Sequence, residues 1–342
     1  MIGVSTYLQD LDLEYLKEAV NLGITHVFTS VQIIEEDYTD FDKKFERFLN
    51  FSIENNLTLI PDIAPRTFDK IGLKDIKELK DKGFNAVRVD GGFDTLEEMK
   101  YLTELFYVYL NASDIKPKLL KELKAYGCDM SKISVMHNFY PRLYTGLNKE
   151  HVVSLNKKFK EYGVRVAAFV QGDEKLRGPV YEGLPTLEKH RGVNPYVATI
   201  ELKESYVDDI YIGDNTAKIS TLEKMVEYDK TGIINLEVSF YDEFKKLYNI
   251  VTPIRRDITD DIIRLAYGRA ELSDIKQRNT VKRYPGAITV DNELSGRYEG
   301  ELNICKKNLP SDGKVNVIGH INPEYIDIFN YITRDTIIKF VQ

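Results

Sequence analysis

The chain has 342 residues, of which 43% are apolar and 30% are charged, and its formal net charge is −7. This length suffices for one large domain with a small one, or for two to three ordinary domains. The acidic balance argues against nucleic-acid binding, and two cysteines far apart in the sequence argue against a disulfide framework.

Short apolar runs alternate with amphipathic segments over the first two thirds of the chain. The runs that we predict as strands are 2–8, 25–33, 57–64, 85–90, 107–113, 133–139, 164–172 and 207–214. The segments that we predict as helices are 12–23, 40–56, 73–83, 95–105, 116–127, 149–163 and 218–228. Nearly continuous apolar strands separated by such helices indicate a parallel sheet covered by helices, and eight units predict an α/β (β/α)8 TIM barrel. A doubly wound open sheet is the alternative, although no Gly-rich dinucleotide turn follows the first strand.

The pattern changes after Gly232. Short strand-like runs follow, separated by turn signals such as Asp291-Asn292 and Asn322-Pro323. These runs are 233–240, 261–268, 286–294, 298–307, 314–322 and 335–342. We therefore predict a barrel domain over residues 1–232 and a separate, mostly β domain over residues 233–342, which we expect to form a small barrel.

Polar side chains gather at the ends of the predicted strands. The active site of a TIM barrel lies at the carboxyl ends of its strands, so these residues are expected to line a pocket. The strand-end candidates are Tyr7, Gln32, Asp62, Arg66, Arg88, Asp90, Asn111, Gln171, Gly172 and Asp214. The loop after the sixth strand, HNFYPRLYTGL, adds His137, Asn138, Tyr140 and Arg142. The long loop over 173–192 adds Arg177 and Glu182, and loops of this length are usually functional or disordered.

Several stretches together resemble a known family. They are VSTYLQ, FTSVQIIEED, VRVDGGF, HNFYPRLYTGL, FVQG, RGPVYEGLPTLEKHR, DDIYIGD and TVDNELSGRYEGELNI, and they extend over essentially the whole chain. The family that the chain resembles is that of the bacterial 6-phospho-N-acetylmuramidases. The resemblance implies a (β/α)8 barrel followed by a cyclophilin-like β-barrel domain. It also implies hydrolysis of the disaccharide N-acetylmuramic acid 6-phosphate–N-acetylglucosamine in cytoplasmic cell-wall recycling.

Glycoside hydrolysis normally requires two carboxyl groups that flank the bond, and the predicted pocket offers four. We expect Asp90 to be kept ionised by Arg88, and Glu182 to be partly buried between apolar neighbours and thus suited as general acid. Asp62 and Asp214 are the further catalytic candidates. Each aspartate has a structural alternative as a helix cap or loop anchor, and Glu182 has one as a salt-bridge partner.

A sugar phosphate requires charge-assisted donors. The candidates are Arg66, Arg142, Arg177 and the backbone N–H groups around Gly172 and Gly178. His137 is a candidate for binding the phosphate or a sugar hydroxyl, and the alternative is a buried histidine that hydrogen-bonds Asn111. Tyr140 is a candidate for stacking on a sugar ring.

The predicted pocket requires no cofactor. The sequence holds five histidines without an H-x-H or H-E-x-x-H pattern, so we predict no metal. The start of the chain has no secretory signal and no apolar run is long enough to span a membrane, so we expect a cytoplasmic protein. A non-enzymatic or differently specific phosphosugar- or carbohydrate-binding barrel protein is the alternative function. A homodimer is a further expectation. The residues Asp291, Tyr298 and Glu301 of the C-terminal domain either serve plain packing or contribute to the dimer interface.

Overall fold

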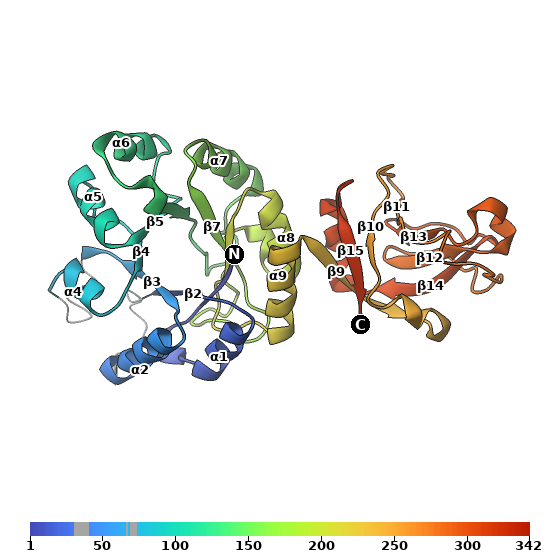
Figure 1. Ribbon diagram of the computed structural model, residues 1–342, viewed down its shortest axis with the longest axis horizontal. Helices are drawn as coiled ribbons and strands as arrows, with labels where there is room; N and C mark the ends of the chain where they lie inside the picture. The colour runs from blue at the N-terminus through green and yellow to red at the C-terminus, as the bar shows by residue number, and fades with distance from the viewer. Residues whose placement is uncertain (31–40, 66–67, 69–73) are drawn as a thin grey trace. The chain divides into compact units, whose positions relative to one another are not determined.

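The computed structural model describes residues 1–30, 41–65, 68 and 74–342. The chain forms two compact units, Met1–Val226 and Glu227–Gln342, and each is described by itself. Figure 1 shows the first unit in blue to yellow and the second mainly in orange and red.

The N-terminal unit is a closed parallel barrel. Its strands are β1 (Ile2–Ser5), β2 (His26–Ser30), β3 (Thr58–Ile63), β4 (Ala86–Val89), β5 (Tyr107–Asn111), β6 (Ile133–Met136), β7 (Arg165–Val170) and β8 (Asp209–Ile212). Each strand pairs with the next, and β1 pairs with β8 to close the ring. The predicted barrel is therefore confirmed, and the open-sheet alternative is excluded.

Helices cover the outside of this barrel (Figure 1). They are α1 (Leu13–Asn21), α2 (Phe41–Glu54), α4 (Ile76–Asp81), α5 (Leu96–Leu105), α6 (Lys118–Tyr126), α7 (Lys149–Glu161), α8 (Pro195–Glu204) and α9 (Ile219–Thr231). Local signals set several ends: Thr95 and Glu98 form a capping box at the start of α5, and Gly127 ends α6 at a φ of 89°.

Alternation along the strands decides which side chains enter the barrel. The inward-facing core comprises Phe28, Ile60, Ala86, Tyr109, Met136, Ala167, Phe169 and Tyr211. Because side chains on a strand alternate with a period of two, the next inward positions towards the carboxyl ends are Ser30, Asp62 and Arg88. The apolar core therefore lies directly beneath the inward-facing polar side chains at the carboxyl ends of the strands.

The C-terminal unit is a β domain, as predicted. Its strands are β9 (Ile233–Phe240), β10 (Val251–Pro253), β11 (Ile262–Arg264), β12 (Ala287–Asp291), β13 (Leu302–Cys305), β14 (Val315–Ile321) and β15 (Ile337–Val341). They form one seven-stranded sheet in the order β10-β15-β9-β14-β12-β13-β11. The pairing of β15 with β9 is parallel, whereas the other pairs are antiparallel.

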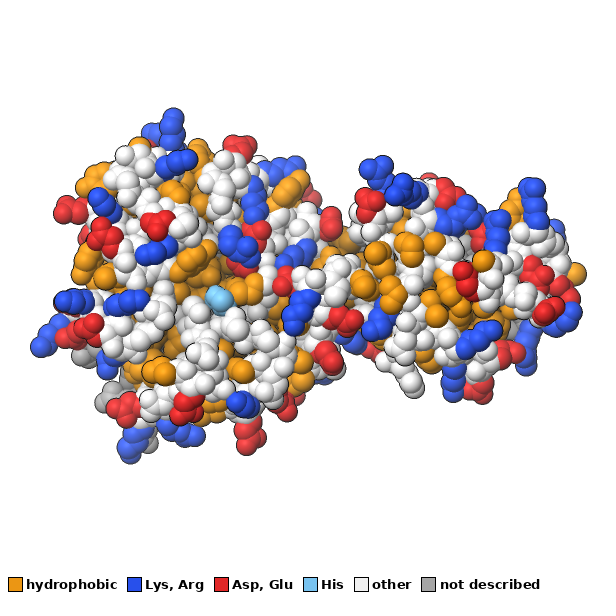
Figure 2. All heavy atoms as spheres, viewed as in Figure 1, with side chains coloured by type: hydrophobic (Ala, Val, Ile, Leu, Met, Phe, Trp, Pro, Cys, Tyr) orange, Lys and Arg blue, Asp and Glu red, His pale blue; other side chains and the backbone are white. Residues whose placement is uncertain are grey.

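The surface carries both charge signs. On the face shown in Figure 2, Lys and Arg side chains are interspersed with Asp and Glu side chains over both units. Among the helices of the described ranges, none is long and apolar enough to cross a membrane.

Candidate active site

A cavity of about 700 Å³ opens at the carboxyl ends of the barrel strands. Its lining comprises Phe28, Ser30, Asp62, Arg88, Asp90, Asn138, Phe139, Pro141, Arg142, Phe169, Arg177, Gly178, Pro179, Val180 and Leu184. Its floor is the aromatic core, where Phe139 and Phe169 pack edge to face with their ring centroids 5.2 Å apart. The volume lies within the usual range of ligand pockets, about 300–1,000 Å³.

Arg88 organises the polar side of this cavity. Its Nη1 donates to Asp62 Oδ1 at 2.6 Å and lies 3.6 Å from Asp90 Oδ1. Its Nη2 donates to the side-chain oxygen of Asn138. The Arg88 side chain is only 4% exposed, so this guanidinium is fixed and holds two carboxyl groups at one wall of the cavity.

The two carboxyl groups differ in their surroundings. The Asp62 side chain is 13% exposed, whereas that of Asp90 is 32% exposed and accepts a hydrogen bond from Asn111 Nδ2 at 3.1 Å. Burial raises the pKa of Asp62 to about 6, although Arg88 acts in the opposite direction, and the nearby Asp90 adds to the rise. A carboxyl group with this pKa retains a proton in mildly acidic solution, as a general acid must.

His137 and Asn138 point in different directions. His137 is fully buried, and its Nε2 lies 2.7 Å from Oδ1 of Asn156 on α7, outside the barrel wall. Burial lowers its pKa to about 4. Asn138, one residue further along, lines the cavity. The structural alternative for His137 therefore holds, with Asn156 rather than Asn111 as its partner, and the His137 side chain does not line the cavity.

Glu188, in the long loop after β7, binds the loop HNFYPRLYTGL that follows β6. This carboxylate accepts backbone N–H bonds from Tyr144 and Gly146, both at 2.8 Å. It also forms an ion pair with Arg191, whose guanidinium donates to the carbonyl oxygens of Tyr140 and Arg142. These contacts lower the pKa of Glu188 to about 2, with the Arg191 hydrogen bond as the largest cause.

Glu188→Gln is expected to lower the free energy of unfolding by about 1–2 kcal/mol at neutral pH, solvent screening included. Because its folded pKa is depressed, the contribution of Glu188 is present above its ordinary value of 4.5 and is lost as the pH falls towards about 2. Urea titrations at several pH values measure the difference in unfolding free energy between the wild type and Glu188→Gln. Glu161→Gln, on the exposed face of α7, serves as control. A difference that grows as the pH falls would contradict the assignment.

Asp214 anchors the loop after β7 rather than facing the cavity. It is fully buried, and its carboxylate accepts backbone N–H bonds from Gly172 at 2.8 Å, Arg177 at 2.9 Å and Leu184 at 3.0 Å. Burial raises its pKa, against these N–H groups, which lower it. The expected phosphate contact of the Gly172 N–H is therefore wrong, because that N–H is used internally. A side chain at Gly172 would also lie 2.2 Å from the carbonyl oxygen of Thr216.

Two arginines at the cavity differ in their support. The guanidinium of Arg177 lies 3.7 Å from the ring centroid of Tyr7, whose hydroxyl donates to the carbonyl of Gly213. Tyr7 is thus buried beneath Arg177, and burial raises its pKa. Arg142 is exposed at the rim, and its guanidinium has no ion-pair or hydrogen-bond partner within the described ranges. Arg142 is therefore available to an anionic group of a ligand.

Of the remaining candidates that the structure describes, none lines the cavity. Glu182 is exposed and absent from the cavity lining, so its expected partial burial is wrong. Its carbonyl oxygen accepts a hydrogen bond from Arg191. Gln171 accepts the N–H of Gly192, and the Tyr140 hydroxyl lies 3.3 Å from that of Ser113. Gln32 and Arg66 lie outside the described residues.

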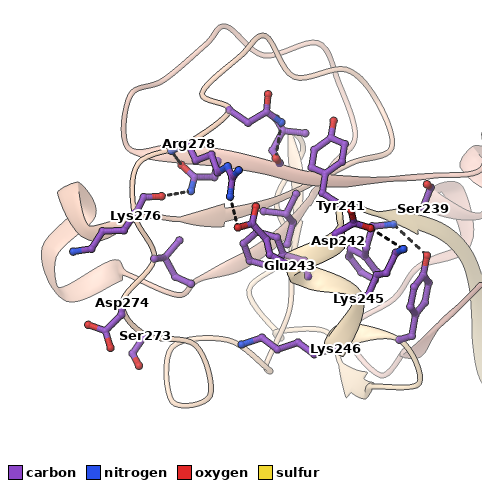
Figure 3. A pocket seen from close by; sticks show the side chains of 18 of the residues that line it. Ser239, Tyr241, Asp242, Glu243, Lys245, Lys246, Ser273, Asp274, Lys276 and Arg278 are labelled. Atoms are coloured by element: carbon purple, nitrogen blue, oxygen red, sulfur yellow. Dashed lines mark hydrogen bonds and ion pairs between the residues drawn. The ribbon is translucent and has the colours of Figure 1, made fainter.

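A larger hollow of about 1060 Å³ lies in the C-terminal unit. Four of its charged side chains pair with one another: Lys245 bonds Asp242 and Arg278 bonds Glu243 (Figure 3). The barrel cavity concentrates fixed cations and a carboxyl group with a shifted pKa, so we place the candidate site there. In the described part of the chain, no group of three His, Cys, Asp or Glu side chains is arranged to hold a metal ion.

Comparisons with known proteins identify a family for the chain. A family model described as 6-phospho-N-acetylmuramidase, N-terminal, matches residues 2–227, and its C-terminal counterpart matches residues 234–341. A conserved protein of unknown function from Enterococcus faecalis has 32% identity and a TM-score of 0.85, with 100% of this chain and 96% of that chain covered. An uncharacterized B. cereus protein has 28% identity and a TM-score of 0.82, with 100% and 99% covered. No curated protein matches the sequence.

Proposed function

Because the chain belongs to the 6-phospho-N-acetylmuramidase family, we propose that it hydrolyses the disaccharide N-acetylmuramic acid 6-phosphate–N-acetylglucosamine. The observation that carries the proposal is the Asp62–Arg88–Asp90 cluster in the barrel cavity, where two carboxyl groups contact one buried guanidinium. The proposal includes a cytoplasmic role in cell-wall recycling, a cyclophilin-like shape for the C-terminal unit and a homodimeric assembly.

Asp62 and Asp90 divide the chemical work in this proposal. Asp62, whose pKa is raised to about 6, donates a proton to the glycosidic oxygen as the bond breaks. Asp90 accepts a hydrogen bond from Asn111 and lies beside Arg88, and these contacts position its carboxylate for attack on the sugar or for activation of water. Arg88 and Asn138 position this pair and do not react.

The phosphate is assigned to the rim of the cavity. Arg142 lines it with a guanidinium that has no protein partner in the described ranges, and Arg177 lines the same cavity. A phosphate at this rim would gain charge-assisted hydrogen bonds without displacing an internal ion pair of Arg142.

The direct test incubates the purified protein with the phosphorylated disaccharide and follows release of both sugars by mass spectrometry. Hydrolysis that is abolished in Asp90→Asn supports the proposal. Binding of the disaccharide without hydrolysis, under conditions where the protein is folded, would instead support a phosphosugar-binding protein.

The wild-type protein is expected to prefer the 6-phosphorylated disaccharide, and Arg142→Ala to reduce this preference by about 10–100-fold, because a charge-assisted hydrogen bond contributes about 1.5–3 kcal/mol. The measurement is kcat/KM for phosphorylated and unphosphorylated substrates. Leu143→Ala, which removes an exposed side chain of the same loop, serves as control. Equal rates of the wild type on both substrates would remove the phosphate from the proposal.

A further inference from the structure

The C-terminal unit contains a second polar pocket that the proposed function does not use. The stretch TVDNELSGRYEGELNI, residues 289–304, forms the end of β12, a 3₁₀ segment (Glu293–Tyr298) and β13. A cavity of about 330 Å³ lies against it. We call it the β12–β13 pocket, and its lining is Ile262, Arg264, Arg283, Thr289, Asp291, Tyr298, Glu301, Asn303 and Val315.

Strand register brings the polar lining together. Asn303 of β13 is paired with Thr289 on one side and with Arg264 on the other, so the three side chains share one face of the sheet. Further along the same strands, this face carries the buried apolar residues Ala287 and Cys305. The polar row therefore borders a hydrophobic core, where polar groups without partners are costly.

Glu301 gives the pocket a fixed wall. Its side chain is 9% exposed and accepts from Arg264 Nε at 2.7 Å, while Arg269 bonds its other oxygen. These ion pairs hold the guanidinium groups in place before any ligand arrives. A wall preorganised in this way loses little conformational entropy on binding.

Two acceptors in the lining of the pocket, Asn303 and Asp291, have room for further donors, although Ser295 already donates to Asp291. Asn303 is only 6% exposed, and its buried Oδ1 atom has no hydrogen-bond partner within the described residues. Asp291 is half buried, and burial, together with the charge of Glu301, raises its pKa to about 6. A ligand that carries hydroxyl or N–H donors would satisfy both groups.

Tyr298 provides an aromatic surface at the same pocket. It is 41% exposed, and the guanidinium carbons of Arg269 and Arg297 lie 4.7 Å and 4.9 Å from its ring centroid. These two guanidinium groups restrict the ring, and 41% of the Tyr298 side chain stays exposed beside them. An exposed aromatic ring beside fixed hydrogen-bonding groups is suited to the apolar face and hydroxyl edge of a sugar.

The charges of the lining select among ligand classes. Arg264 and Arg283 are matched by Asp291 and Glu301, so the pocket favours neither a polyanion nor a cation. Its volume lies at the lower end of ligand pockets, about 300–1,000 Å³, and suits one ring rather than a chain. We propose that the β12–β13 pocket binds a neutral monosaccharide in its pyranose form, with its hydroxyl or N–H donors towards Asp291 and Asn303 and its ring against Tyr298.

The test uses the full chain and N-acetylglucosamine and glucose as separate probes, with inorganic phosphate as the anionic arm. Calorimetry measures affinity, and hydrogen exchange with mass spectrometry locates protection. We expect at least one sugar, but not phosphate, to slow exchange over residues 289–304. Tyr298→Ala is expected to weaken this binding by about tenfold or more, while Tyr298→Phe, which keeps the ring, stays close to the wild type.

Tyr241→Ala is the matched control, because Tyr241 is a tyrosine of similar exposure (44%) that lines the larger hollow instead. Unchanged affinity in this variant supports the assignment. The inference is overturned if neither sugar binds, if protection is confined to the barrel or follows phosphate, or if Tyr241→Ala rather than Tyr298→Ala weakens binding. Hydrolysis of the disaccharide is measured in a separate assay, so the proposed function can hold or fail whichever of these outcomes is found.

Discussion

Asp62→Asn is expected to lower kcat on the phosphorylated disaccharide by about 10²–10⁴-fold, the usual contribution of a positioned general acid. The amide keeps the size of the side chain and retains an oxygen that can accept from Arg88 Nη1. The cluster should therefore stay folded, and only the proton donor is removed. A thermal melt of the variant close to that of the wild type would establish this separation.

A substrate with an activated leaving group distinguishes the acid from its partner. In an aryl glycoside of the same phosphosugar, the aryl oxide departs without protonation. The Asp62→Asn variant should therefore hydrolyse this substrate at close to the wild-type rate. Asp90→Asn should not recover, because its group acts on the sugar or on water rather than on the leaving oxygen. Glu182→Gln should stay near the wild type, since Glu182 does not line the cavity. A large loss in Glu182→Gln with an active Asp62→Asn would return the acid to the long loop.

The pH profile gives an independent reading of Asp62. Activity requires the protonated form, so kcat should fall as the pH rises above about 6, the raised pKa of Asp62. The sign for stability is the same: between about 4 and 6 the folded state holds a proton that the unfolded state has lost, so stability falls with rising pH. The residual activity of Asp62→Asn should not show the fall in kcat above about pH 6.

The barrel was predictable because its signal is repeated along the chain. Each strand is a short, mostly apolar run, and the helices between the strands are amphipathic, so errors at single boundaries do not change the architecture. The same argument predicted that polar strand ends gather at one edge, and Asp62, Arg88 and Asp90 do line one cavity.

The roles within that edge were harder to predict. Alternation along β3 and β6 separates Asp62, which shares the inward direction of Ile60, from His137, which follows the inward Met136 and faces outward. This parity was available in the sequence. The exposure of Glu182 was not, because it depends on how residues 173–192 fold over the barrel, and that course is set by contacts such as those of Glu188, whose backbone partners are 42–44 residues away.

Asp214 was predicted as a catalytic candidate, but its carboxylate accepts three backbone N–H bonds and serves a structural role. Asp214→Ala would leave the N–H groups of Gly172, Arg177 and Leu184 buried without their acceptor. We expect the free energy of unfolding of the barrel to fall by about 3–5 kcal/mol, as for other buried charged groups whose partners are left unpaired.

The loss should be local before it is global. Arg177, Gly178 and Leu184 form one wall of the cavity, and Asp214 holds the backbone of that wall to the end of β7. Hydrogen exchange should therefore accelerate first over residues 172–184, and KM should rise even where the variant is folded. Glu174→Ala, an exposed acid of the same loop, should change stability by less than about 0.5 kcal/mol. An Asp214→Ala protein as stable as this control, with exchange over 172–184 unchanged, would show that the loop keeps its shape without its anchor and would reopen Asp214 as a catalytic candidate.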